Sequence, residues 1–279
     1  MKDAMIITAY NDFELLEYLL KYYNKYYDCW VHIDKKSVIP PSFIKSISEL
    51  GNIKIYRKYK INWGSWNHVL AVIYLLKQAR KSGNYGYYHI LPANAFPTKN
   101  FIKVNKFFEN NSKNYMEIAN VVGEKHLEER QVYYWNLRLF NWRGKFGKKI
   151  QNKLVGLQKK LGIRRKIRFK FKGYFYCHLT EVFVDYVIQR LTKDKDFIKQ
   201  LKSTWVPEEF FFQNLIVGSE FETTIENNSL IYDDWVSGRG RPACLETKDL
   251  DEIFSDESFW ARKIRDFSLA KEIINNIDI

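Results

Sequence analysis

Apolar residues in the first hundred positions of the chain alternate between two spacings. Short, nearly unbroken apolar runs are typical of buried strands, and they occur at residues 5–10, 29–33, 53–56 and 87–91. Apolar residues at helical spacing lie between these runs, most clearly at 13–20 and 69–76. Strands that alternate with helices predict a parallel sheet covered by helices, and therefore an α/β fold.

The pattern after residue 100 is less regular. It predicts a short strand at 115–118 and helices at 101–108, 146–161, 180–190 and 206–217, the last with Pro207 near its first turn. No linker-like stretch separates the two halves of the chain. We therefore expect one domain over residues 1–279, with a basic amphipathic insertion at about 143–172.

Composition predicts a folded protein without membrane spans. The 279 residues are 46% hydrophobic and 17% aromatic, which is enough for a sizeable core. No segment reaches the roughly 20 apolar residues that a membrane-spanning helix needs, and the first residues lack a signal-peptide pattern. Three widely spaced cysteines, Cys29, Cys177 and Cys244, indicate neither a disulfide framework nor a zinc site. We expect a cytoplasmic protein.

The net charge of +13 comes from one segment. Residues 143–172 hold thirteen Lys or Arg and no acidic residue, which leaves 32 basic against 32 acidic residues elsewhere. Within this segment, one helical face carries the apolar residues Ile150, Leu154, Leu157 and Leu161. Such a helix fits an anionic membrane surface. Nucleic acid is the competing ligand, and an ordinary solvated helix is the alternative without a ligand.

Common nucleotide and metal motifs are missing from the chain. It has no P-loop, no GxGxxG after its first strand and no GxSxG elbow. Its five histidines never pair at helical spacing. Two Asp-x-Asp pairs, at 194–196 and 249–251, follow no apolar strand, so we interpret both as solvated surface. No metal site is expected.

Six segments, in order and at fitting separations, resemble one enzyme family. They are VHIDKKS (31–37), WGSWNHVLAVIYLLKQA (63–79), YYHILPANAFPTK (87–99), WVPEEFFFQNLI (205–216), IYDDW (231–235) and FWARKI (259–264). Together they resemble the core-2/I-branching β-1,6-N-acetylglucosaminyltransferases, glycosyltransferase family 14, which also contains peptide xylosyltransferases. The similarity runs from about residue 4 to 265.

The resemblance implies a GT-A-type, Rossmann-like fold with a mixed central sheet flanked by helices. It implies inverting transfer of N-acetylglucosamine from UDP-GlcNAc to a sugar hydroxyl, of β-1,6 branching type, in surface polysaccharide or glycan synthesis. No metal or other cofactor is expected, and no nucleic acid partner. The acceptor would be a glycan or a lipid-linked glycan, met at the inner face of the cytoplasmic membrane. The alternatives are another donor, such as UDP-xylose, or a basic RNA- or lipid-binding protein with a decayed active site.

The catalytic base implied by the resemblance is Glu209 of VPEE, and Glu208 fills the acidic position before it. A carboxylate suffices to take the proton of an attacking hydroxyl. Without the resemblance, the two acids are better explained as complements of a helix dipole.

Fixed cations must meet the UDP diphosphate if no metal does so. Arg241 and Lys263 match the basic positions of the family. Arg239 or Arg262 could replace either of them after a small shift in register.

The remaining donor-side candidates lie at element ends. Asp34, after an apolar strand, either binds the uracil or ribose or only ends its strand. Ser65, at a helix start, either contacts the nucleotide or, as the preferred reading, caps the helix.

On the acceptor side the resemblance implies Arg130, with Glu117 as a partner of sugar hydroxyls. Trp235 could stack on a sugar face, and Tyr176 stands where the family has an acceptor-stacking aromatic residue. One departure is clear, because Ala95 replaces the Asp of the family's SGQDFP-like loop.

Overall fold

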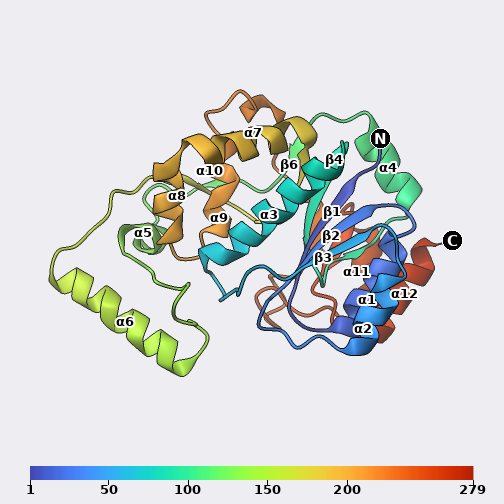
Figure 1. The fold of residues 1–279 in the computed structure, drawn as a ribbon, viewed down its shortest axis with the longest axis horizontal. Helices are drawn as coiled ribbons and strands as arrows, with labels where there is room; N and C mark the ends of the chain where they lie inside the picture. Colours follow the sequence, from blue (N-terminus) through green and yellow to red (C-terminus); the bar gives the residue numbers. More distant parts are fainter. Residues whose placement is uncertain (279) are drawn as a thin grey trace.

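A computed structural model describes residues 1–278 and shows a seven-stranded mixed sheet (Figure 1). Its strand order is β10-β6-β9-β4-β1-β2-β3. Strands β3, β2, β1 and β4 run parallel, whereas β9 is antiparallel to β4. The strands are β1 (Ala4–Ala9), β2 (Asp28–Ile33), β3 (Ile53–Tyr56), β4 (Tyr87–Pro92), β6 (Asn114–Tyr115), β9 (Cys177–Thr180) and β10 (Ile225–Glu226).

Helices cover both faces of this sheet (Figure 1). Side chains of β1 alternate between two hydrophobic clusters, since Met5 and Ile7 face one and Ala4 and Ile6 the other. The first cluster contains residues of α1 (Phe13–Tyr23), α2 (Pro41–Ser48), α4 (Phe101–Glu109), α11 (Leu250–Ser255) and α12 (Phe267–Ile277). The second contains residues of α3 (Trp66–Ser82), α5 (Lys125–Val132), α7 (Glu181–Lys193), α8 (Lys195–Lys202), α9 (Glu208–Phe211) and α10 (Gln213–Ile216). The predicted α/β fold with a mixed sheet is confirmed.

The parallel register aligns the carboxyl ends of the central strands. Ala9 of β1 pairs with Ile33 of β2, and Thr8 pairs with Pro92 of β4. The segments after these strands therefore meet at one edge of the sheet, where ligands of open α/β sheets collect.

A three-stranded sheet adds segments from the end of the chain. It consists of β11 (Ile231–Asp233), β12 (Trp260–Arg262) and β5 (Phe96–Pro97), in that order. Because β5 follows the end of β4 by a short turn, this sheet brings the IYDDW and FWARKI segments to the carboxyl edge of the main sheet. A two-stranded sheet of β7 (Ala119–Asn120) and β8 (Phe171–Lys172), and two short 3₁₀ helices at Glu222–Thr224 and Thr247–Asp249, complete the fold.

Helix α6 (Lys145–Lys160) lies within the basic insertion and projects from the rest of the molecule (Figure 1). Its buried residues are Gly147, Gln151, Val155 and Gln158. Both glutamines exchange hydrogen bonds with the backbone of residues 134–136. The predicted apolar stripe is not this face: Leu157 and Leu161 are 52% and 61% exposed.

Two other expectations about elements needed correction. The single helix predicted at 206–217 is two short helices, α9 and α10, and Pro207 precedes the first of them. The strand predicted at 115–118 is the two-residue β6, Asn114–Tyr115, and the amide of Ile118 bonds to the side chain of Asn227 instead of to a strand. Within residues 1–278, the structure contains no helix with the length and apolar character needed to cross a membrane.

Candidate active site

The VPEE segment enters α9 through a strained turn. Val206 has φ +53°, which is an outlier for a β-branched residue. Its amide donates to the carbonyl of Gly64 (3.0 Å), and its carbonyl accepts from Arg130 (3.1 Å). Strained backbone of this kind persists only where surrounding contacts determine it, and it clusters at functional sites.

Arg130 holds Glu209 in place. Its Nη1 donates to Glu209 Oε2 at 2.9 Å, while its Nε and Nη2 donate to the carbonyls of Trp205 and Val206. The Arg130 side chain is only 11% exposed, against 32% for Glu209. Arg130 therefore spends its donors on protein groups and orients the carboxylate, which remains accessible.

A second cation approaches the same oxygen of Glu209. Lys172 of β8 donates to Oε2 at 3.3 Å, so neither cation occupies Oε1. The next residue, Gly173, donates its amide to the Glu209 carbonyl (2.9 Å). A Cβ on Gly173 would lie 1.7 Å from the carbonyl oxygen of Glu117. Only glycine therefore lets the backbone at 173 approach the backbone at 117 this closely.

Glu208 occupies a different environment from Glu209. It is 7% exposed, and its Oε1 lies 3.6 Å from His68 Nδ1. Its Oε2 is buried without a hydrogen-bond partner among the described residues. His68 also contacts Thr8 at the end of β1 (3.2 Å). The two acids therefore do not merely share a helix dipole, which was the simpler interpretation of the sequence.

Glu117, Asp233 and Arg262 form a mixed-charge cluster. Ser229 donates to Glu117 Oε1 (2.9 Å), and Arg262 lies 3.6 Å from Asp233. Burial, followed by the charge of Glu117, raises the pKa of Asp233 to about 7. Burial lowers the pKa of Arg262 to about 10, so its guanidinium stays protonated at neutral pH.

Lys263 follows Arg262 and belongs to a cluster of cations. Its Nζ donates to the carbonyl of Pro242 (2.9 Å), directly after Arg241, which brings the two predicted phosphate ligands to neighbouring segments. Burial lowers the pKa of Lys263, and the nearby charges of Arg262, Arg265 and Arg143 lower it further. Mutual repulsion of this kind marks a site that favours an anion.

Two members of this cation cluster were missed in the sequence analysis. Arg265 stands two residues after Lys263, and the alternation of cations in ARKIR was a usable signal. Arg143 comes from the insertion, and no sequence signal connects it with Lys263.

Arg239, an alternative to the predicted phosphate ligands, and the first residue of each Asp-x-Asp pair form ion pairs within the protein. Arg239 pairs with Asp234, Glu246 and Asp249, so its charge is already compensated. Asp249 is 6% exposed, and Asp194 accepts from Arg168 and Arg190. The interpretation of both pairs as solvated surface is therefore wrong for these first aspartates, which are structural ion-pair partners.

Of the two donor-side candidates at element ends, Asp34 has a clear local role and Ser65 does not. Asp34 Oδ1 accepts from the amides of Lys36 (3.0 Å) and Ile61 (3.2 Å), and so holds the turn after β2. Ser65 occupies the N-cap position of α3, but its side chain makes no capping bond, and its buried hydroxyl has no partner among the described residues. The capping role preferred for Ser65 is therefore wrong.

The remaining acceptor-side candidates lie around Arg262. The guanidinium is 5.2 Å from the Tyr176 ring, so this ring faces the mixed-charge cluster. Trp235, two residues after Asp233, is 55% exposed. Ala95 is fully buried in the first hydrophobic cluster, which explains why no acidic residue fits there.

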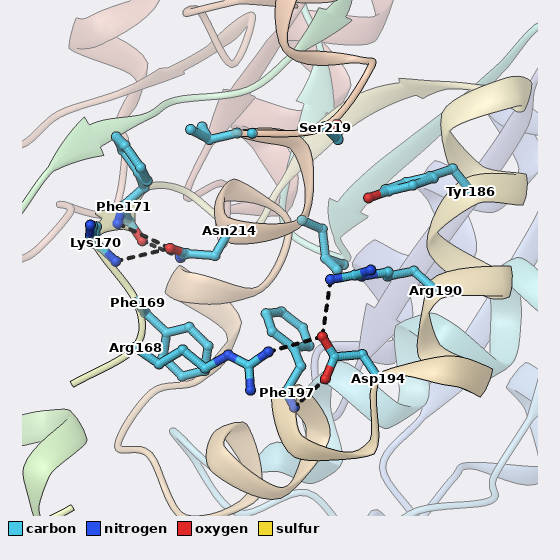
Figure 2. A pocket seen from close by; sticks show the side chains of 13 residues that line it. Arg168, Phe169, Lys170, Phe171, Tyr186, Arg190, Asp194, Phe197, Asn214 and Ser219 are labelled. Atoms are coloured by element: carbon cyan, nitrogen blue, oxygen red, sulfur yellow. Dashed lines mark hydrogen bonds and ion pairs between the residues drawn. The ribbon is translucent and has the colours of Figure 1, made fainter. Parts of the chain in front are cut away.

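Of two cavities, one is lined by predicted site residues and the other is not. The larger, about 690 Å³, is lined by Arg130, Glu209, four tryptophans and one face of α6. The smaller, about 240 Å³, lies beside α7 and contains none of the predicted site residues. Figure 2 shows Arg168 and Arg190 pointing at Asp194 there, which neutralises part of their charge. We therefore place the candidate active site at the larger cavity and the adjoining charge clusters.

Comparison with known proteins identifies the family. The family model for Core-2/I-Branching enzyme matches residues 4–258, and no curated protein matches. Among solved structures, S. aureus TarS 1–349 in complex with UDP-GlcNAc is 16% identical with a TM-score of 0.32, over 44% of this chain and 36% of that chain.

The apo structure of the bifunctional glycosyltransferase WbbM is 10% identical with a TM-score of 0.46, over 99% of this chain and 49% of that one. The chain spans less than half the length of either structure. By the family match over most of its length, the chain belongs to the Core-2/I-Branching enzyme family.

Proposed function

We propose that this glycosyltransferase moves N-acetylglucosamine from UDP-GlcNAc to a sugar hydroxyl, with inversion and without a metal ion, to form a β-1,6 branch in a surface glycan. The observation that carries the proposal is an oriented carboxylate on the cavity wall together with a separate cluster of cations that Arg143 connects to that wall. Glu209 lies on this wall, and the cations around Lys263 are connected to it through Arg143, whose guanidinium lies 5.0 Å from the ring of Trp63.

Glu209 has the geometry of a general base. Arg130 and Lys172 both contact Oε2, which leaves Oε1 to take the proton of the acceptor hydroxyl. As that oxygen bonds to C1 of the donor sugar, the bond from C1 to the phosphate oxygen breaks. Attack from the face opposite the leaving group inverts the configuration at C1.

The leaving UDP carries away the electron pair of the broken bond. Lys263, Arg241, Arg265 and Arg143 would stabilise the charge that develops on its diphosphate, the task a divalent cation performs in other transferases. Asp34 and Ser65 remain candidate nucleotide contacts, and Glu117, Trp235 and Tyr176 remain candidate acceptor contacts.

Helix α6 supports contact with an anionic membrane and hence with a lipid-linked glycan acceptor. Phe146, Leu157 and Leu161 are 76%, 52% and 61% exposed, and lysines surround them. Exposed apolar side chains among cations fit the boundary between lipid head groups and acyl chains. The cavity lies on the opposite, inward-facing side of the helix.

The donor and the metal requirement are tested together. The purified chain is incubated with UDP-GlcNAc, UDP-xylose and other UDP-sugars in excess EDTA, and UDP release is measured with and without added Mn²⁺. We expect turnover with UDP-GlcNAc that EDTA leaves unchanged. Strict dependence on Mn²⁺ would overturn the role given to the cations, and turnover of UDP-xylose alone would replace the donor.

A further inference from the structure

Four tryptophans from three separate segments meet in the larger cavity. Trp135 and Trp205 are stacked, with ring centroids 4.6 Å apart, and Trp142 lies 4.9 Å from Trp205. Trp63 meets Trp205 edge to face at 6.5 Å. With the facing residues of α6, Asn152, Val155, Gly156 and Lys159, these rings line a space that we call the tryptophan groove.

The groove is not simply a piece of core. Trp63 is 41% exposed, and Trp142 and Trp205 are only partly buried. The indole Nε1 of Trp205 is buried and has no hydrogen-bond partner among the described residues, whereas Nε1 of Trp135 donates to the carbonyl of Glu129. A buried indole N–H normally finds an acceptor, so the Trp205 donor is unsatisfied in this structure.

The groove is continuous with Glu209. Trp205 directly precedes the strained Val206, and its carbonyl accepts from Arg130, the residue that orients Glu209. Gly64, with φ +70°, packs against Trp205, since a Cβ there would lie 3.3 Å from Cδ1 of that ring. The backbone that positions the catalytic carboxylate therefore also positions the aromatic rings.

The polar groups of the groove identify the chemistry of its ligand. Lys159 pairs with Glu129 at 2.9 Å, and Asn152 and His126 add further hydrogen-bonding groups. Charges that neutralise each other favour neither a polyanion nor an acyl chain. Flat aromatic faces together with hydroxyl-binding groups fit the rings of a neutral sugar.

We propose that the tryptophan groove binds the sugar residues next to the one attacked, so that the acceptor is an oligosaccharide of at least two residues. This inference rests on the proposed function and names its acceptor class. A sugar residue has about eleven heavy atoms. If each occupies roughly the volume of one water molecule in the liquid, about 30 Å³, the residue fills on the order of 300 Å³. The groove, at about 690 Å³, holds more than one.

The test compares Trp142→Ala with Phe146→Ala, using an array of immobilised mono- to hexasaccharides and titrations with the best soluble binder. Phe146 is on the same insertion but points to solvent, at 76% exposure, so it is a matched control. We expect the wild type to bind oligosaccharides but not monosaccharides. Trp142→Ala should weaken binding about tenfold or more, and Phe146→Ala should not change it.

Donor hydrolysis by the wild type tests the proposed function separately, because it needs the donor site but no acceptor. Circular dichroism and thermal unfolding show whether Trp142→Ala is folded, and loss of oligosaccharide binding by the folded variant supports the groove. Unchanged oligosaccharide binding in that variant, or wild-type binding to monosaccharides alone, overturns the groove and leaves the proposed function standing. No turnover of any UDP-sugar by the wild type would overturn the function itself.

Discussion

Glu209 and Glu208 are neighbours in sequence but differ in what they can do chemically. Glu209 is partly exposed, is held by two cations at one oxygen and lines the cavity, whereas Glu208 is buried beside His68. A base must reach the proton that it abstracts, so this difference in accessibility favours Glu209. The same geometry makes Arg130 a positioning residue.

We expect Glu209→Gln to lower the turnover of sugar transfer by about 100-fold or more, because the amide keeps the shape but cannot take the proton. UDP binding, measured by calorimetry, should remain. Glu220→Gln, at an exposed carboxylate outside the cavity, is the control. Near-native turnover of Glu209→Gln would move the role to Glu208.

Asp233 should make the protein less stable as the pH rises. Its pKa in the folded state, about 7, lies above the ordinary value of 3.8, so the folded state keeps a proton that the unfolded state has lost. Stability therefore falls between about pH 4 and 7, by on the order of 2–4 kcal/mol, and changes little from this group at higher pH.

The substitution Asp233→Asn should remove this fall, since the amide stays neutral. Urea unfolding at pH 5 and pH 8 measures it, with Asp251→Asn on the exposed side of α11 as the control. If the free energy of unfolding changes equally between pH 5 and pH 8 in the wild type and in Asp233→Asn, ionisation of Asp233 does not destabilise the fold.

Elements with strong local patterns could be predicted from the sequence, and those that depend on distant partners could not. The central strands and α3 follow their apolar periodicity closely. The break between α9 and α10 coincides instead with a hydrogen bond from a remote segment, because the Gly173 amide donates to the Glu209 carbonyl that a continuous helix would use for residue 213. The buried pair His89 and His178, 2.9 Å apart, exists only because β4 and β9 align them.

The candidate site shows the same limit. The resemblance to a family selected Glu209, Arg130, Lys263 and Arg241, and the fold brings Arg130 to Glu209 and Lys263 to the segment of Arg241. The resemblance could not reveal the tryptophan groove or Arg143, because these depend on how the insertion packs against residues 134–136. Two polar residues of α6, Gln151 and Gln158, hold the helix there by accepting hydrogen bonds from the backbone amides of Asn136 and Tyr134. An apolar pattern does not single out glutamines.

At the scale of the whole molecule, α6 has two faces with different expected partners. Its inward face lines the groove, and its outward face exposes apolar side chains among lysines. If the outward face rests on a membrane, the groove opens beside the lipid surface, where a lipid-linked glycan would be presented. Lys149, Lys153 and Lys160 are exposed and make no ion pair among the described residues, unlike Lys159, which pairs with Glu129.

We therefore expect the triple change of Lys149, Lys153 and Lys160 to Gln to weaken binding to anionic vesicles by about 100-fold, at roughly 1 kcal/mol per lysine. Co-sedimentation with vesicles of phosphatidylglycerol measures this, and added salt should weaken the wild type in the same direction. Changing Lys193, Lys195 and Lys202 to Gln removes the same charge from exposed positions on α7 and α8. Equal losses in both triple variants would indicate attraction by net charge alone, and binding that survives in the α6 variant would exclude this helix as the contact.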